Sequence, residues 1–254
     1  MIFTVFSKSI VGYKNKIKNK SSQDYIKYEI LEDSIICSIA DGHSGEFFTH
    51  SHKGSKYACE AAIEVLKKYI TYNLYDLDTF LKENKIQKEI CNLWRELVKE
   101  DFIKNSPRAY KLNYFRYGTT LLTAVVTNKY RLFLKLGDGE ILTNKNNIFN
   151  KELYVPPKKL VDCMAEEEAC NKMVWKLEEN TDIGGDSIIL YSDGYENSFS
   201  SYEFMIKDLK DTLDKYNKNI FTKLILEKSY ENYLAKLSKE GSRDDISIIF
   251  VNIL

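Results

Sequence analysis

The sequence is poor in the residues that mark repetitive, disordered or membrane-spanning proteins. Its 254 residues include only 3 Pro and 11 Gly, which excludes the collagen-like and low-complexity classes. The 37 basic and 37 acidic residues cancel, so the charge favours neither nucleic acid nor a membrane surface as a partner. No apolar run approaches the roughly 20 residues that span a bilayer. The first residues lack the pattern of a secretory signal, and we expect a cytoplasmic protein with no membrane and no nucleic acid among its partners.

Motifs of cysteine chemistry are also missing. The five cysteines are odd in number and scattered, and no pair has the Cys-x-x-Cys or zinc-finger spacing of a redox or metal motif. None lies in the Cys-x5-Arg pattern of phosphatases that use a cysteine nucleophile. We expect these residues to be reduced and buried: Cys37, Cys59, Cys91, Cys163 and Cys170. Because no repeat or linker interrupts the sequence, residues 1–254 are expected to form one domain.

The hydrophobic periodicity predicts an α+β protein. Short β-branched or aromatic runs predict strands at 2–7, 24–31, 34–40, 119–127, 130–137, 173–177, 187–192 and 245–254. Apolar residues at helical spacing predict helices at 54–73, from about Ile90 to before Pro107, at 202–217 and at 219–238. Asn128-Lys129 fits a hairpin turn, whereas 143–170 are expected to contain polar loops around Pro156-Pro157. Runs of strands and pairs of helices favour antiparallel sheets with helices packed outside.

Acidic residues stand at the ends of several of these strands. Asp41-Gly42, Asp138-Gly139 and Asp193-Gly194 each follow an apolar run, and Asp244-Asp245 begins the last strand. Asp-Gly is a strong hairpin signal, so the alternative explanation is a set of unrelated surface turns. Helical patterns follow Asp41 and Asp193, which argues against hairpins there, while "EILTN" after Asp138 fits a return strand. We therefore expect these aspartates to gather at one edge of the sheets.

Such a gathering of carboxylates needs a counter-charge. Two carboxylates about 4 Å apart repel each other by roughly 4 kcal/mol at an effective dielectric constant near 20. Several together would rival the stability of a whole domain, which is about 5–15 kcal/mol. Protonation or a bound cation removes this repulsion. Oxygen ligands favour Mg²⁺ or Mn²⁺ over zinc, and a glycine beside a ligand lets its backbone carbonyl approach the ion.

Five segments, taken in order, carry a family resemblance. They are "SSQDYIKY" (21–28), "ADGHSGE" (40–46), "YGTTLLTAVV" followed by "LGDGE", "ILYSDGYENSF" and "SRDDISIIFV". They are similar, respectively, to a Glu-Asp or Gln-Asp motif, Asp-Gly-His-Gly-Gly, a Gly-Ser/Thr-Thr strand with Gly-Asp-Ser, Ser-Asp-Gly, and a closing Asp-Asn strand. Asp245 takes the place of that last Asn. Together they resemble the metal-dependent protein phosphatases of the protein phosphatase 2C type, particularly the bacterial branch, from about residue 12 to residue 253.

This resemblance implies a fold and a metal site. The fold is a sandwich of two antiparallel β-sheets with helices on both outer faces, in α-β-β-α layers. A site for two Mn²⁺ or Mg²⁺ ions would lie at one edge of the sandwich. Asp41 would bridge the two ions and Gly42 would offer its carbonyl to one of them. Asp193 and Asp244 would bind the other ion, and Asp24 would lie close to it, directly or through water.

Two further features of the family concern a third ion and the residue that contacts the substrate phosphate. Asp138 resembles the aspartate that helps to hold a third, looser ion in bacterial members. Members of the family often have a phosphate-binding arginine before the first acidic motif, but here the sequence reads "KNKIKNKSSQD". Lys18 or Lys20 would then contact the substrate phosphate as point charges, without the bidentate fork of arginine. Gln23 supplies no carboxylate if that position ligates metal.

The activity that the resemblance implies is hydrolysis of phosphoserine or phosphothreonine in a protein, by direct attack of a metal-activated water. An opposing Ser/Thr kinase is the expected further partner. His43 is the candidate general acid that protonates the leaving alkoxide, although a lone histidine is often structural. Two other functions stay open. One is a binding or regulatory module whose metal site is too poor to turn over, and the other is a phosphatase of small phosphorylated metabolites.

Overall fold

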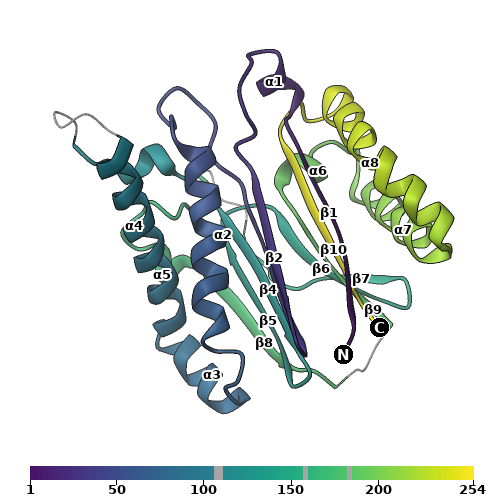
Figure 1. Cartoon of the computed structure of the whole chain (residues 1–254), viewed down its shortest axis with the longest axis horizontal. Helices are drawn as coiled ribbons and strands as arrows, with labels where there is room; N and C mark the ends of the chain where they lie inside the picture. The colour runs from purple at the N-terminus through teal and green to yellow at the C-terminus, as the bar shows by residue number, and fades with distance from the viewer. Residues whose placement is uncertain (106–110, 157–159, 182–184) are drawn as a thin grey trace.

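The computed structural model describes residues 1–254 except 106–110, 157–159 and 182–184. Two antiparallel sheets of five strands each form the centre of the molecule. Helices α2, α3 and α4 cover one outer face, and α7 and α8 cover the other (Figure 1). The predicted α+β sandwich is confirmed.

The first sheet joins the two ends of the sequence. Its strand order is β1-β10-β9-β6-β7. β1 and β10 pair along their whole length, from Phe3 opposite Ile253 to Ile10 opposite Ile246. The strands are β1 (Phe3–Ile10), β6 (Glu140–Lys145), β7 (Ile148–Lys151), β9 (Asp186–Tyr191) and β10 (Ile246–Ile253).

The second sheet has the order β2-β3-β4-β5-β8. All of its neighbouring strands are antiparallel, and Asn128-Lys129 joins β4 to β5 as the sequence predicts. The strands are β2 (Tyr25–Leu31), β3 (Ser34–Ala40), β4 (Leu121–Thr127), β5 (Tyr130–Leu136) and β8 (Val174–Glu179).

Long helices form the outer layers, and short ones lie at the ends of strands. The long helices are α2 (Ser51–Lys67), α3 (Leu74–Lys82), α4 (Lys85–Asn105), α7 (Tyr202–Lys218) and α8 (Ile220–Glu240). The short ones are α1 (Tyr13–Lys16), the 3₁₀ helix η1 (Tyr114–Tyr117), α5 (Ala169–Lys172) and α6 (Asp193–Glu196).

Strand β3 shows how the layers are held together. Ile35, Cys37 and Ile39 point between the two sheets, whereas Ile36 and Ala40 point the other way, toward the helices. All residues of β3 are buried because the strand is covered on both faces. This explains why "SIICSIA" reads as a continuous apolar run and not as an alternating one. The cysteines are free, and all except the half-buried Cys170 are buried.

The structure corrects several predicted boundaries. The helix predicted at 54–73 begins at Ser51 and ends at Lys67. A separate helix, α3, follows Asn73, whose side chain accepts a hydrogen bond from the Asp76 backbone at 3.0 Å. Residues 143–170 are not only loop, because they include β7 and the start of α5. Pro157 lies outside the described residues.

One predicted strand pairing is also wrong. "EILTN" after Asp138 is a strand, β6, but it pairs with β7 and β9 in the first sheet. Strand β5, which precedes Asp138, lies in the second sheet. The turn at Asp138 therefore carries the chain from one sheet to the other. This crossing brings Asp138 to the end of the sandwich where the other aspartates lie.

Candidate metal centre

The register of the second sheet places Asp24 beside Asp41. Asp24 comes directly before β2, and Asp41 comes directly after β3. The two strands are antiparallel, and Tyr25 lies opposite Ala40. The start of β2 and the end of β3 are therefore at the same edge. Strand pairing alone therefore brings together two residues that belong to different sequence motifs.

The first sheet brings two further aspartates to this end of the sandwich. Asp193 follows β9, and Asp244 precedes β10. These strands are also antiparallel, with Tyr191 opposite Ile248. The sequence prediction that the strand-end aspartates gather agrees with this arrangement.

A serine links the two halves of the group. The Ser192 hydroxyl donates a hydrogen bond of 2.7 Å to Asp24 Oδ2 and accepts one of 3.0 Å from the Ser247 backbone N–H. Asp24 belongs to the second sheet, whereas Ser192 and Ser247 belong to the first. The other carboxylate oxygen of Asp24, Oδ1, is buried and has no hydrogen-bond partner among the described residues. Such an atom is costly unless a further group binds it.

The aspartates are close enough to disturb each other's ionisation. Burial, and then the charge of Asp245, raises the pKa of Asp24 to about 8. Burial, and then the charges of Asp24 and Asp193, raises the pKa of Asp41 well above its usual range. Burial, and then the charge of Asp193, raises the pKa of Asp138 to about 6. Each shift has the same cause, which is negative charge gathered in a poorly hydrated place.

Asp41 is at the centre of the group. After burial, which is the largest cause, the negative charges of Asp24, Asp193 and Asp138 raise the pKa of its carboxyl. A carboxyl with a raised pKa keeps its proton to a higher pH than an isolated aspartate does. A divalent cation would take over the role of these protons, because it neutralises the same oxygens.

The donor set fits a hard divalent cation. The atoms on offer are carboxylate oxygens, which Mg²⁺ and Mn²⁺ prefer, and they include the unpartnered Asp24 Oδ1. No three acidic, His or Cys side chains in the described part of the chain already have the arrangement of a closed metal site. The carboxyl groups would therefore have to reorient when a cation replaces the protons that their raised pKa values favour.

Two glycines allow the backbone to come close at this edge. A Cβ atom on Gly42 would lie 2.6 Å from the Gln23 carbonyl oxygen, and one on Gly194 would lie 2.0 Å from the Asp245 carbonyl oxygen. Real Cβ atoms do not approach backbone so closely. The glycine after Asp41 and the one after Asp193 are thus required by packing across strand ends, and not by a hairpin.

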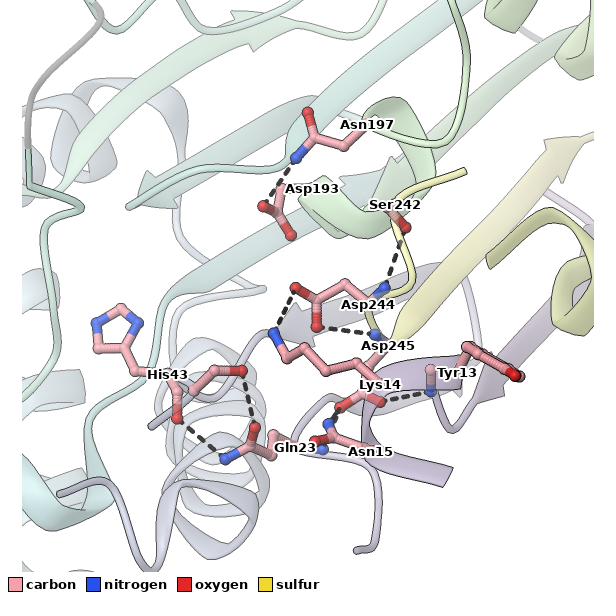
Figure 2. Close-up of polar contacts among 12 residues, drawn as sticks. Tyr13, Lys14, Asn15, Gln23, His43, Asp193, Asn197, Ser242, Asp244 and Asp245 are labelled. Carbon is pink, nitrogen blue, oxygen red and sulfur yellow. Dashed lines mark hydrogen bonds and ion pairs between the residues drawn. The ribbon is translucent and has the colours of Figure 1, made fainter. Parts of the chain in front are cut away.

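Lys14 is a member of the site that sequence reasoning missed. Its ammonium nitrogen lies 3.3 Å from Asp244 Oδ2 (Figure 2), and its positive charge also counteracts the raised pKa of Asp193. The Asn197 side chain donates a 3.0 Å hydrogen bond to Asp193 Oδ2. Lys18 and Lys20, the predicted phosphate contacts, are exposed, and no hydrogen bond or ion pair joins either side chain to a described residue.

Asp245 anchors the segment that carries Lys14. It is buried, and Oδ1 accepts a hydrogen bond of 2.6 Å from the Gly12 backbone. Oδ2 accepts bonds of 2.9 Å from the Asn15 side chain and 2.7 Å from the Gln23 backbone. Because both of its oxygens accept hydrogen bonds, Asp245 holds the segment 12–23 in place. The adjacent Asp244 remains directed toward the carboxylate group.

His43 lies at the border of the site. Its backbone N–H donates to the Gly118 carbonyl at 3.0 Å, and its carbonyl accepts from the Gln23 side chain at 3.0 Å (Figure 2). Its ring meets the edge of Phe48 with centroids 5.2 Å apart. Burial lowers the pKa of His43, and the charge of Glu166 opposes this shift. These backbone contacts hold the histidine in place without using its imidazole nitrogens.

Comparison with known proteins agrees with this geometry. Residues 11–235 match the sequence profile of a family described as Protein phosphatase 2C. The chain belongs to the protein phosphatase 2C family. A comparison with curated protein sequences finds no match.

Solved bacterial structures share the fold of this protein phosphatase 2C chain at low identity. The catalytic domain of the serine/threonine phosphatase PstP, in complex with two manganese ions, is 13% identical with a TM-score of 0.61, covering 99% of this chain and 98% of that one. PppA of Pseudomonas aeruginosa is 16% identical with a TM-score of 0.62, covering 100% and 99%. The serine/threonine phosphatase of S. agalactiae is 14% identical with a TM-score of 0.62, covering 100% of both.

The length and apolar character of its helices bear on whether this family member crosses a membrane. Within the described ranges, no helix combines the length and the apolar character needed to cross a bilayer.

Proposed function

We propose that residues 1–254 act as one catalytic domain, a cytoplasmic Mn²⁺- or Mg²⁺-dependent phosphatase of phosphoserine and phosphothreonine in proteins. A Ser/Thr kinase would supply its substrates. The observation that supports this most is the group of poorly hydrated carboxyls of Asp24, Asp41 and Asp193, contributed by both sheets, whose pKa values are all raised by burial. Such a group is stable at neutral pH only with protons or cations, and membership of the family favours cations.

The proposed metal residues divide into three roles. Asp41 would bridge two ions, with the Gly42 carbonyl on one of them. Asp193 and Asp244 would bind the other, and the unpartnered oxygen of Asp24 would face it directly or through water. Asp138 would help to hold a third ion. The metal residues are therefore Asp24, Asp41, Gly42, Asp138, Asp193 and Asp244.

Two divalent cations, when bound, supply hydroxide near neutral pH by lowering the pKa of a water molecule, and they offset the charge of the phosphate. His43 would give a proton to the leaving Ser or Thr oxygen. Its lowered pKa makes it release that proton readily, while an approaching phosphate dianion favours its protonated form. Asn197 would keep Asp193 oriented through their hydrogen bond.

Lys14 is the better candidate for the phosphate contact. Its ammonium already lies among the carboxylates, whereas Lys18 and Lys20 are exposed. On this proposal Lys14 leaves Asp244 when a cation binds there and then contacts a phosphate oxygen. A lysine supplies a point charge and not a fork, so we expect weaker orientation of the phosphate than an arginine would give.

An aryl-phosphate assay tests the proposal directly. Activity should appear with Mn²⁺ or Mg²⁺, disappear with EDTA, and return when the cation is restored. Phosphopeptides should then be hydrolysed faster than a panel of sugar and nucleotide phosphates. Activity that persists in EDTA would contradict the metal mechanism, and a preference for the small phosphates would replace the protein substrate by a metabolite.

A second candidate function is a phosphatase-like binding module with little turnover. One observation favours it: the Lys14 ammonium occupies Asp244, and a lysine that stayed there would keep a cation away from that carboxylate. Mn²⁺ binding without hydrolysis of any phosphate ester would select this function.

A further inference from the structure

A pocket lined by basic and aromatic side chains lies beside the proposed catalytic edge. It has a volume of about 520 Å³, and its lining includes Phe47, Arg95, Lys111, Tyr114, Phe115 and Arg116. Among the lining residues that the structure describes, three are cationic and only Glu167 is acidic. We call it the basic pocket. Its net positive charge contrasts with the carboxylate group of the metal centre.

Arg95 is fixed in the wall of the basic pocket. One of its terminal nitrogens donates hydrogen bonds of 3.3 Å to the Ala165 carbonyl and 2.8 Å to the Glu166 carbonyl. Its guanidinium also lies over the Tyr114 ring, 4.7 Å from the centroid. Carbonyl oxygens and an aromatic face hold the guanidinium without cancelling its charge. Arg95 therefore contributes a positive charge in a defined place.

Arg116 and Lys111 are the available cations. Neither side chain makes a hydrogen bond or an ion pair with any residue that the structure describes. The backbone of Arg116 is nevertheless well held, because its N–H donates to the Asn113 carbonyl at 3.2 Å and its carbonyl accepts from the His50 N–H at 2.9 Å. A fixed backbone with an uncommitted guanidinium is the arrangement that binds an external oxyanion.

The walls of the pocket continue into the segment that carries His43. The Phe47 ring meets Phe48 edge-on at 5.6 Å, and Phe48 meets the His43 ring at 5.2 Å. Gly118, two residues after Arg116, accepts the backbone hydrogen bond of His43. A peptide whose phosphoresidue lies near His43 can therefore place a neighbouring side chain over the basic pocket.

We infer that the basic pocket binds an oxyanion of the substrate polypeptide, either the carboxylate of an acidic residue or a second phosphate, close in sequence to the residue that is dephosphorylated. This inference rests on the proposed function for its setting, since it assigns a substrate class to the same enzyme. Carboxylate and phosphate share the geometry that a guanidinium recognises. Phe47 and Phe115 are 52% and 45% exposed, so they offer apolar contact to the stems of such side chains.

A series of phosphothreonine peptides tests the inference. One Glu, or one further phosphoserine, is moved through the four positions on either side of the phosphothreonine in an otherwise neutral peptide. The best acidic or doubly phosphorylated peptide should have a KM about tenfold below that of the neutral one, as expected for a single charge-assisted hydrogen bond. The position of the optimum gives the direction in which the substrate runs, and comparison of the two arms separates carboxylate from phosphate.

Variants connect that preference to the pocket. Arg116→Gln and the pair Lys111→Ala/Arg116→Gln should lower the ratio of kcat/KM for the acidic and neutral peptides about tenfold. Lys99→Ala removes an exposed lysine of α4 outside the pocket and should leave the ratio unchanged. An equal ratio in the parent and the double variant would overturn the inference.

A binding measurement separates this inference from the proposed function. Fluorescence anisotropy of a labelled acidic phosphopeptide, recorded in EDTA, needs no turnover. The double variant should bind about tenfold more weakly than the Lys99→Ala control. If the protein hydrolyses no phosphate ester, the proposed function fails while this readout still decides the pocket. Equal affinities, or tighter binding of single-stranded nucleic acid than of the peptide, would refute the pocket's assignment even in an active enzyme.

Discussion

The ammonium nitrogen of Lys14 lies 3.3 Å from a carboxylate oxygen of Asp244, although 230 positions separate the two residues in the sequence. Both side chains are partly exposed, at 40% and 35%, so the pair adds little to stability. Its importance is local. It places a positive charge of the protein where, on the proposed function, a cation and a phosphate would both bind.

Replacing Lys14 should lower the rate of substrate hydrolysis and strengthen the binding of metal. In Lys14→Ala we expect kcat/KM for a phosphopeptide to fall about tenfold, because one charge-assisted contact is lost. Mn²⁺ should bind more tightly, since no ammonium competes for Asp244. Steady-state kinetics and calorimetric titration measure the two effects. Lys18→Ala and Lys20→Ala are matched controls, and a larger kinetic loss in either would return the phosphate contact to them.

Asp193→Asn should separate catalysis from folding. The amide keeps the shape of the side chain and its contact with Asn197, but it is a much weaker ligand for a cation. We expect hydrolysis to fall at least 100-fold, with an unchanged circular dichroism spectrum. Without metal, the variant should melt at a higher temperature than the parent, because one source of carboxylate repulsion is gone. Full activity in this variant would remove Asp193 from the metal site.

The metal-free protein should lose stability as the pH rises. The folded state raises the pKa of Asp138 from 3.8 to about 6 and that of Asp24 to about 8. The folded chain then binds more protons than the unfolded chain, so the contribution is fully present below pH 3.8 and is lost through these two values. At about 1.4 kcal/mol for each pH unit, Asp138 alone accounts for about 3 kcal/mol.

Urea unfolding in EDTA between pH 5 and 8 measures this loss. The free energy of unfolding should decrease steadily across the range. Asp138→Asn should flatten the curve below about pH 6 and leave the decrease between pH 6 and 8, which comes from Asp24. A free energy that is constant or rises with pH would show that folding does not raise the pKa values of these aspartates.

Added Mn²⁺ should stabilise the protein more at high pH than at low pH, which opposes the pH dependence of the metal-free protein. A ligand at 100 times its dissociation constant stabilises a fold by about 2.7 kcal/mol, and carboxylates bind cations only after they release their protons. The rise in melting temperature with millimolar Mn²⁺ should therefore be larger at pH 8 than at pH 5. Asp41→Asn, which lies at the centre of the group, should abolish most of the rise. A melting temperature that does not change when Mn²⁺ is added would mean that no cation site forms.

The sequence predicts the strand-end aspartates well and their partners poorly. Asp41 and Asp193 are recognisable because each ends an apolar run on Asp-Gly and is followed by a helical pattern. Their convergence needs only antiparallel pairing. Lys14, by contrast, lies in a segment with several similar lysines, and nothing local distinguishes it from Lys18. Its role comes from the Gly12 and Asn15 bonds to Asp245, which are tertiary contacts.

The same limit applies to the fold. The pattern of "EILTN" correctly predicts a strand, but no local feature states that the chain changes sheets at Asp138. The helix boundary at Asn73 has a local signal in the sequence, because Asn is a favoured N-cap. No local feature marks Arg116, because a pocket is a property of packed elements and not of a motif.

The pairing of β1 with β10 also has a consequence during synthesis. The ribosome makes Asp41 and Asp138 long before Asp244 and Asp245 emerge, and until then Gly12 and Asn15 lack their hydrogen bonds to Asp245. A nascent or C-terminally truncated chain therefore holds an incomplete set of acids. On the proposed function, hydrolysis of a phosphate ester would therefore require β10 to be in place, because Asp244 lies directly before that strand and completes the group of acids.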